Sequence, residues 1–115
     1  MKEDKIIANL LVGSNIINMV CKDIAVNKTN IEVSELLIEE LSELIKAVVK
    51  LERWDNGETT LRYNIDEISN NLYEELADVI IIMLQFIHKN NIECEKLLDE
   101  ISKKLIRYYE TISDK

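Results

Sequence analysis

Two short segments of the sequence carry paired acids at a spacing that suits a metal site. The segment Glu-Glu-Leu-Ser-Glu-Leu at 39–44 is echoed by Glu-Glu-Leu-Ala-Asp-Val at 74–79. Within each segment two acids stand three positions apart: Glu40 with Glu43, and Glu75 with Asp78. A three-residue step turns a helix by about 300°, so both members of a pair lie within about 60° on one face. If the two helices are antiparallel neighbours, the four carboxylates can meet.

Carboxylates that meet repel one another, and burying an ionised group is costly. A divalent cation removes this conflict, and hard oxygen ligands suit Mg²⁺ or Mn²⁺. If the first segment were the only evidence, its acids would be interpreted as solvated residues on a helix surface. The second segment favours a metal site, because Ile82 follows Asp78 by one turn and shares its stripe. A surface interpretation would have to expose that isoleucine as well.

Apolar residues recur at steps of three and four along most of the chain, which predicts four helices. The first is expected over 4–24, and the second from a Thr29–Glu32 capping box to about residue 52. A third helix is expected to begin at Asn64 with Glu67, and a fourth to be capped by Asn90 with Glu93. Short connections favour antiparallel neighbours, so we predict an all-α, four-helix bundle-like fold.

Composition supports one all-α domain over residues 1–115, because the chain has no proline, two glycines and 47% hydrophobic residues. A formal charge of −8 points away from a nucleic-acid polymer as partner. The apolar run at 79–87 is too short for a bilayer, which takes about 20 residues, so no membrane contact is expected. Cys21 and Cys94 lack metal-ligand spacing and are interpreted as reduced thiols in a cytoplasmic protein.

The third expected helix is apolar on more sides than three small neighbours readily cover. We therefore expect the chain to form a homodimer or homotetramer through its core helices. Tyr108 and Tyr109, in the fourth helix, are interpreted as bundle and interface residues.

Glu-x-x-Glu on one helix followed by Glu-x-x-Asp on the next resembles the signature of the MazG-like, all-α NTP pyrophosphohydrolases. This superfamily includes the dimeric dUTPases, the dCTP pyrophosphatases and phosphoribosyl-ATP pyrophosphohydrolase. The match runs through LLIEELSELIKAVVK and NLYEELADVIIIMLQF. The 31 residues between Glu43 and Glu75 exceed the usual gap of the family. The surplus fits an extended second helix and the loop after it.

The resemblance implies Mg²⁺-dependent hydrolysis of a (d)NTP to the (d)NMP and pyrophosphate, with Mn²⁺ as a substitute metal, in house-cleaning of the nucleotide pool. It implies that Glu40, Glu43, Glu75 and Asp78 are the catalytic metal ligands. Glu39 is a secondary candidate, for a second metal or for orienting water. Metal-assisted hydrolysis needs no Ser-His-Asp arrangement, which suits a chain with one histidine.

Positive charge is expected to meet the phosphates opposite the metal. Lys46, Lys50 and Arg53 follow Glu43 at steps of three, four and three, close to its stripe. We expect Lys50 and Arg53 to bind phosphate, with Lys46 and Arg62 as secondary candidates. An ordinary solvated face with helical acid partners is an equally good interpretation of each. Asn71, one turn before Glu75, and Gln85, two turns after Asp78, are candidates for hydrogen bonds to base or sugar.

Two other functions could use the same acids. A di-iron carboxylate bundle needs Glu-x-x-His on two helices, and this chain has no histidine in place. A non-catalytic helical dimer, acting as an adaptor or regulatory module, would carry the same acids merely solvated.

Overall fold

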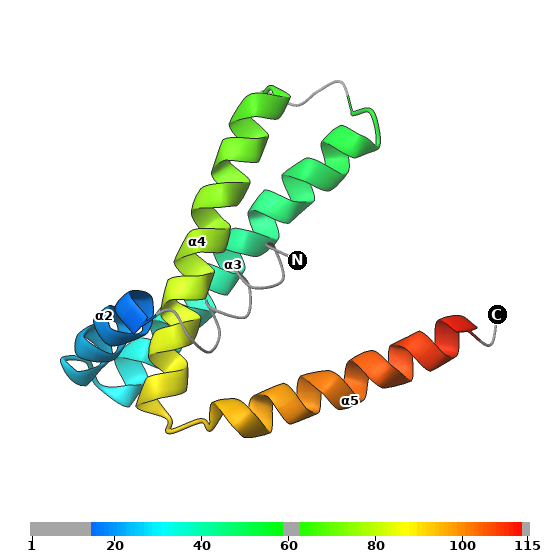
Figure 1. The fold of residues 1–115 in the computed structure, drawn as a ribbon. Coiled ribbons are helices and arrows are strands. Elements are labelled where there is room, and N and C mark those ends of the chain that lie inside the picture. Colours follow the sequence, from blue (N-terminus) through cyan, green and yellow to red (C-terminus); the bar gives the residue numbers. More distant parts are fainter. Residues whose placement is uncertain (1–14, 59–62, 114–115) are drawn as a thin grey trace.

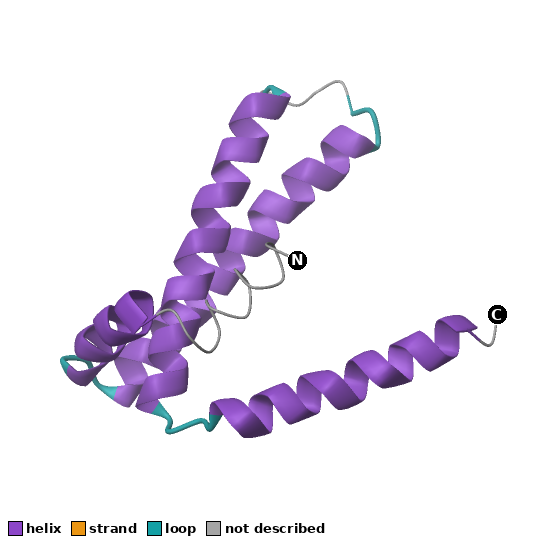
Figure 2. Ribbon diagram, in the orientation of Figure 1, coloured by secondary structure: helices purple, strands orange, loops and turns teal. Residues whose placement is uncertain are grey.

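The structure is a computed structural model that describes residues 15–58 and 63–113. Its order is α2 (Asn15–Val26), α3 (Asn30–Asp55), α4 (Ile65–Lys89) and α5 (Cys94–Ser113). These described ranges contain helices and no strand (Figure 2). The predicted all-α class is confirmed. The part of the first expected helix before Asn15 lies outside the described residues.

The start of α3 is set by a local sequence motif, as predicted. The backbone N–H of Glu32 donates to Thr29 Oγ1 at 3.1 Å, and the Thr29 N–H donates to Glu32 Oε2 at 3.4 Å. This capping box satisfies two of the donors that a helix N-terminus leaves without partners. Likewise, α4 begins after Asn64, whose Oδ1 accepts from the Glu67 N–H at 2.9 Å.

The predicted cap of the last helix is wrong. Asn90 ends α4 instead of starting α5, because its Nδ2 donates back to the Phe86 carbonyl at 2.9 Å. The next residue, Asn91, has a φ of 52°, the left-handed conformation that asparagine tolerates better than most residues. The chain turns there, and α5 begins at Cys94.

The core lies where α4 packs against α3 on one side and α2 on the other. α3 and α4 form an antiparallel hairpin along most of their length, and α2 crosses the lower part of α4 (Figure 1). Val33 and Ala47 of α3 are fully buried against this hairpin, as is Ile68 of α4. A separate cluster of Cys21, Leu84 and Ile87 joins α2 to the C-terminal half of α4.

α5 does not complete the bundle within one chain. It leaves the end of α4 and runs away from the other three helices (Figure 1). None of its residues is buried, and its contacts with the core cluster come from Cys94 and Leu97 in its first turn. No helix in the described part of the chain is both long and apolar enough to cross a membrane.

Candidate metal centre

The α3–α4 hairpin brings three of the four predicted acids together. Glu40 comes from the middle of α3, and Glu75 and Asp78 come from one face of α4. Each offers a carboxylate oxygen, and these oxygens all lie within 4.8 Å of one another. We call these three residues the acidic cluster. Because they come from two helices packed along their length, the helix packing holds them close despite their charge.

The fourth predicted acid, Glu43, is occupied elsewhere. Its Oε1 accepts from Lys46 Nζ at 3.2 Å, one turn further along α3, and its side chain is 45% exposed. Glu39 is exposed and lies outside the acidic cluster. Both still act on the cluster through charge, because they are among the carboxylates that raise the pKa of Glu40.

The electrostatics of the cluster centre on Glu40. Its pKa is raised, first by desolvation at the helix interface, then by the negative charges of Asp78 and Glu75. A raised carboxyl pKa means that the ionised form is disfavoured in this position. The arrangement therefore favours any positive charge placed between the three carboxylates.

The acids border the apolar interior. Ile82, one turn after Asp78, is 4% exposed, so the stripe that carries Glu75 and Asp78 continues into the core, as the sequence argument required. Glu40, Asp78 and Ile82 line a hollow of about 160 Å³ between α3 and α4. The carboxylates are thus partly solvated groups at the mouth of a packed helix pair.

The sequence analysis missed one lysine side chain that lines this hollow. Lys28, in the connection before α3, also lines it and donates from Nζ to Gln85 Oε1 at 2.9 Å. Gln85 is 3% exposed, and this contact joins it to a residue 57 positions away. No local motif links the two residues, so only the packing of the connection on α4 reveals Lys28. Gln85 itself was a predicted candidate, and the structure places it beside the acids.

The other predicted substrate residues divide into two groups. Lys50 and Asn71 line one hollow of about 200 Å³, where Lys50 Nζ lies 4.6 Å from the centre of the Tyr63 ring. Arg53 instead pairs with Glu58 at the end of α3. Arg62 lies outside the described residues.

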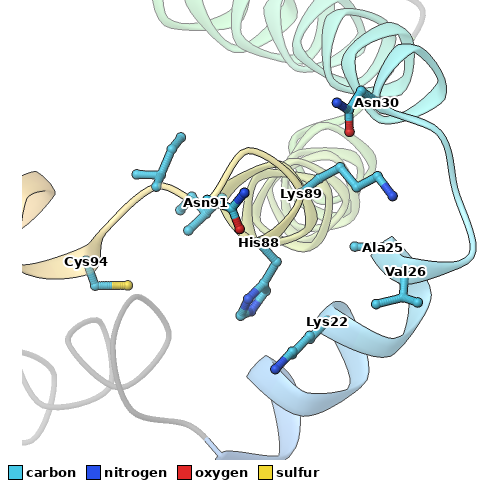
Figure 3. Close-up of a pocket in the computed structure, with 10 residues that line it drawn as sticks. Lys22, Ala25, Val26, Asn30, His88, Lys89, Asn91 and Cys94 are labelled. Carbon is cyan, nitrogen blue, oxygen red and sulfur yellow. The ribbon is translucent and has the colours of Figure 1, made fainter.

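A larger hollow than the one beside the acids lies elsewhere in the described residues. It measures about 620 Å³ at the C-terminal ends of α2 and α4, with Lys22, His88 and Lys89 among its lining residues (Figure 3). None of the acidic cluster lines it. The acids instead border the smaller hollow of about 160 Å³ between α3 and α4.

The donor set of the acidic cluster fits a hard divalent cation. Its ligands are carboxylate oxygens, which suit Mg²⁺ and Mn²⁺. Three carboxylates in an open site leave coordination positions for water and for oxygens of a bound ligand. Mg²⁺ commonly keeps several waters and bridges protein carboxylates to phosphates.

Comparison with known proteins agrees with this chemistry. The model of the MazG nucleotide pyrophosphohydrolase domain matches residues 28–112, which include the whole acidic cluster. No curated protein and no solved structure matched the chain.

Proposed function

This chain belongs to the MazG nucleotide pyrophosphohydrolase family, and we propose that it hydrolyses a nucleoside triphosphate between the α- and β-phosphates. The products would be the monophosphate and pyrophosphate, in the upkeep of the nucleotide pool. The observation that carries the proposal is the acidic cluster, whose oxygens lie within 4.8 Å of one another across two helices. The mutual repulsion of these carboxylates, which contributes to the raised pKa of Glu40, would be relieved by a bound cation.

We propose that Glu40, Glu75 and Asp78 hold Mg²⁺, with Mn²⁺ able to replace it. When bound, such an ion neutralises phosphate charge and lowers the pKa of a bound water. Glu43 is the proposed fourth ligand. To reach the ion it must exchange its pair with Lys46, and an exposed pair of this kind contributes only about 0–1 kcal/mol. Glu39 remains a secondary candidate for orienting water.

The chain's own cations would bind the rest of the triphosphate. Lys28 shares a hollow with Glu40 and Asp78, and Lys50 shares one with Asn71. In chain order Glu40 lies between Lys28, just before α3, and Lys50 on α3, and we propose that an extended triphosphate held at the acids reaches a cation on either side. Lys50 and Arg53 are our proposed phosphate contacts from α3, and Lys28 is added by the structure. Gln85 and Asn71 are proposed to contact base or sugar.

The reaction is tested by pyrophosphate release from a panel of canonical and damaged (d)NTPs with Mg²⁺. Asp78→Asn and Glu75→Gln are expected to lower the rate at least about 100-fold, because each removes a charge that holds the ion. Glu74→Gln is the matched control, since Glu74 is exposed on the same helix and lies outside the cluster. It should keep wild-type activity. Equal rates in all three variants would refute the site.

The competing function is a non-catalytic helical adaptor. It predicts no pyrophosphate release from any nucleotide and no thermal shift with Mg²⁺ plus a nonhydrolysable triphosphate. A shift without turnover would instead support a nucleotide-binding module. The two measurements together separate the three cases.

A further inference from the structure

Gln85 places an amide in an otherwise apolar part of α4. Its neighbours along the helix, Leu84 and Ile87, belong to the core cluster. Gln85 is 3% exposed, and among the described residues it is the one polar side chain that is buried. Burying an amide is costly unless it is hydrogen-bonded, so the partner of this amide matters for the fold and for the site beside it.

The partner is Lys28, which is fixed at both its backbone and its ammonium. Gln85 Oε1 accepts from Lys28 Nζ at 2.9 Å. The Lys28 N–H donates to the Ala25 carbonyl at 3.1 Å, and the next residue, Thr29, caps α3. Asn27 and Thr29 on either side are exposed, whereas Lys28 is half-buried. Lys28 is therefore held in the hollow and is not a freely moving surface lysine.

The acceptor that holds Lys28 is neutral, although carboxylates line the same hollow. Glu40 and Asp78 border it together with Lys28, yet within the described residues the ammonium pairs with the amide and with no carboxylate. An amide oxygen accepts a hydrogen bond without neutralising the donor's charge, and the other N–H groups of the ammonium stay available. A whole positive charge is thus kept next to the acids without consuming theirs.

The amide also determines which partners Lys28 has. Apart from Lys28 and Gln85, the hollow is lined by two acids and by apolar residues, which are Leu36, Ile81 and Ile82. If the Gln85 oxygen were removed, the polar partners left to Lys28 in this hollow would be Glu40 and Asp78. A lysine paired with either acid would compete with a metal ion for it.

We propose that Gln85 is a positioning residue, which holds Lys28 apart from the acids so that its ammonium binds a phosphate of the metal-bound ligand. This inference rests on the proposed function of the acidic cluster. The ligand class is a polyphosphate with a divalent cation, because an ion and a lysine that share one hollow can neutralise the same phosphate. The role uses Gln85 Oε1 and is separate from the base or sugar contact proposed above, for which Nε2 remains.

The first test measures Mg²⁺ binding alone by titration calorimetry. Gln85→Met keeps the length of the side chain and removes the acceptor, so Lys28 should turn to the acids and weaken Mg²⁺ binding about threefold. Lys28→Met should bind Mg²⁺ at least as tightly as wild type. The double variant Lys28→Met/Gln85→Met should behave like Lys28→Met, since no lysine remains to compete. A merely structural role of Gln85 would weaken Mg²⁺ binding equally in both backgrounds, which would overturn the proposal.

The second test measures binding of inorganic tripolyphosphate at saturating Mg²⁺. This probe has no base or sugar, so it reports the phosphate contact alone. Lys28→Met should raise the dissociation constant about tenfold, because it removes a charge-assisted hydrogen bond. Gln85→Met should raise it about threefold or more, and the double variant should match Lys28→Met instead of multiplying the two losses. Lys22→Met is the matched control, since Lys22 is exposed on α2 and lies outside this hollow. It should stay within about twofold of wild type.

Two results of the second test would overturn the proposal, provided that circular dichroism shows the variants folded. Unchanged tripolyphosphate binding in Gln85→Met, with a loss confined to nucleotides, would assign the amide to base or sugar alone. Losses that multiply in the double variant would mean that Gln85 and Lys28 act independently.

Pyrophosphate release by wild type separates this proposal from the proposed function. If wild type hydrolyses a nucleotide while Lys28→Met binds tripolyphosphate normally, the role of the Lys28–Gln85 pair is refuted and the reaction stands. If wild type binds Mg²⁺ and tripolyphosphate with the expected losses in the variants but hydrolyses nothing, the pair stands and the reaction is refuted. A wild type that binds neither probe refutes both.

Discussion

The α3–α4 hairpin and α5 are built from similar apolar spacing, yet they end in different environments. In the hairpin the apolar residues face one another, and Val33 and Ile68 are at most 1% exposed. In α5 no residue is buried. The acids differ in the same way, because those of the hairpin meet within 4.8 Å whereas Glu100 of α5 pairs with Lys103 in solvent. Packing, rather than residue type, therefore separates a candidate metal site from an ordinary charged surface.

The largest expected effect tests whether the packed helices α2, α3 and α4, rather than α5, carry the fold of a single chain. Leu84→Ala removes a buried side chain from the core cluster and should lower the free energy of unfolding by about 2–5 kcal/mol. Ile106→Ala, on the exposed side of α5, should change it by less than about 0.5 kcal/mol. Urea denaturation followed by circular dichroism gives both values. Similar losses in the two variants would contradict the comparison.

Metal binding should stabilise the hairpin and leave α5 unaffected. With Mg²⁺ at 100 times its dissociation constant, the free energy of unfolding should rise by about 2.7 kcal/mol. For a chain of this size that corresponds to roughly 10 °C in melting temperature. Asp78→Asn should abolish most of the gain, and Glu74→Gln should retain it. A gain that survives in Asp78→Asn would place the metal outside the acidic cluster.

The sequence was sufficient where the determining contacts are local. The Thr29–Glu32 and Asn64–Glu67 caps lie within four residues, and both helix starts were predicted correctly. The acid pair of α4 was placed on one face by helical spacing alone. The prediction that Asn90 caps the start of the last helix was wrong because asparagine can occupy either end of a helix. Here its side chain donates back to the Phe86 carbonyl and ends α4.

Contacts between distant segments could not be predicted in this way. The Lys28–Gln85 hydrogen bond spans 57 positions and depends on how the connection before α3 lies on α4. The direction in which α5 leaves the bundle depends on the turn at Asn91. The apolar spacing of α5 is the same whether the helix packs within its own chain or against another chain, so it does not predict this direction. The Glu43 side chain can pair with Lys46 or turn towards the acidic cluster. Helical spacing allows both conformations, and the structure shows the pair with Lys46.

A smaller effect is expected at the start of α3, which positions Glu40 along the hairpin. Thr29→Ala removes the side-chain oxygen that accepts from the Glu32 N–H and should cost about 1 kcal/mol in unfolding free energy. Thr29→Ser keeps that oxygen and should be nearly neutral. Thermal melts of both variants at equal concentration measure the difference. A neutral Thr29→Ala would mean that packing, and not the cap, fixes the start of this helix.

The smallest expected effect is the loss of stability caused by the ionised carboxylate of Glu40. Because the pKa of Glu40 is raised in the folded chain, ionising it costs stability above the folded pKa. That cost disappears as the pH falls through the folded pKa and below the unfolded one. Without divalent metal, Glu40→Gln should therefore be more stable than wild type at neutral pH by a few tenths of a kcal/mol, with no difference in acid.

With saturating Mg²⁺ the order should reverse, because wild type gains a ligand that Glu40→Gln has lost. The measurement is a set of urea curves at several pH values, with chelator and with Mg²⁺. Glu100→Gln on α5 is the control, since its carboxylate pairs with Lys103 and faces no acidic cluster. It should show neither the gain without metal nor the reversal with it. A destabilised Glu40→Gln in chelator at neutral pH would show that its carboxylate is held by a cation of the chain itself, and the cluster would then need no metal.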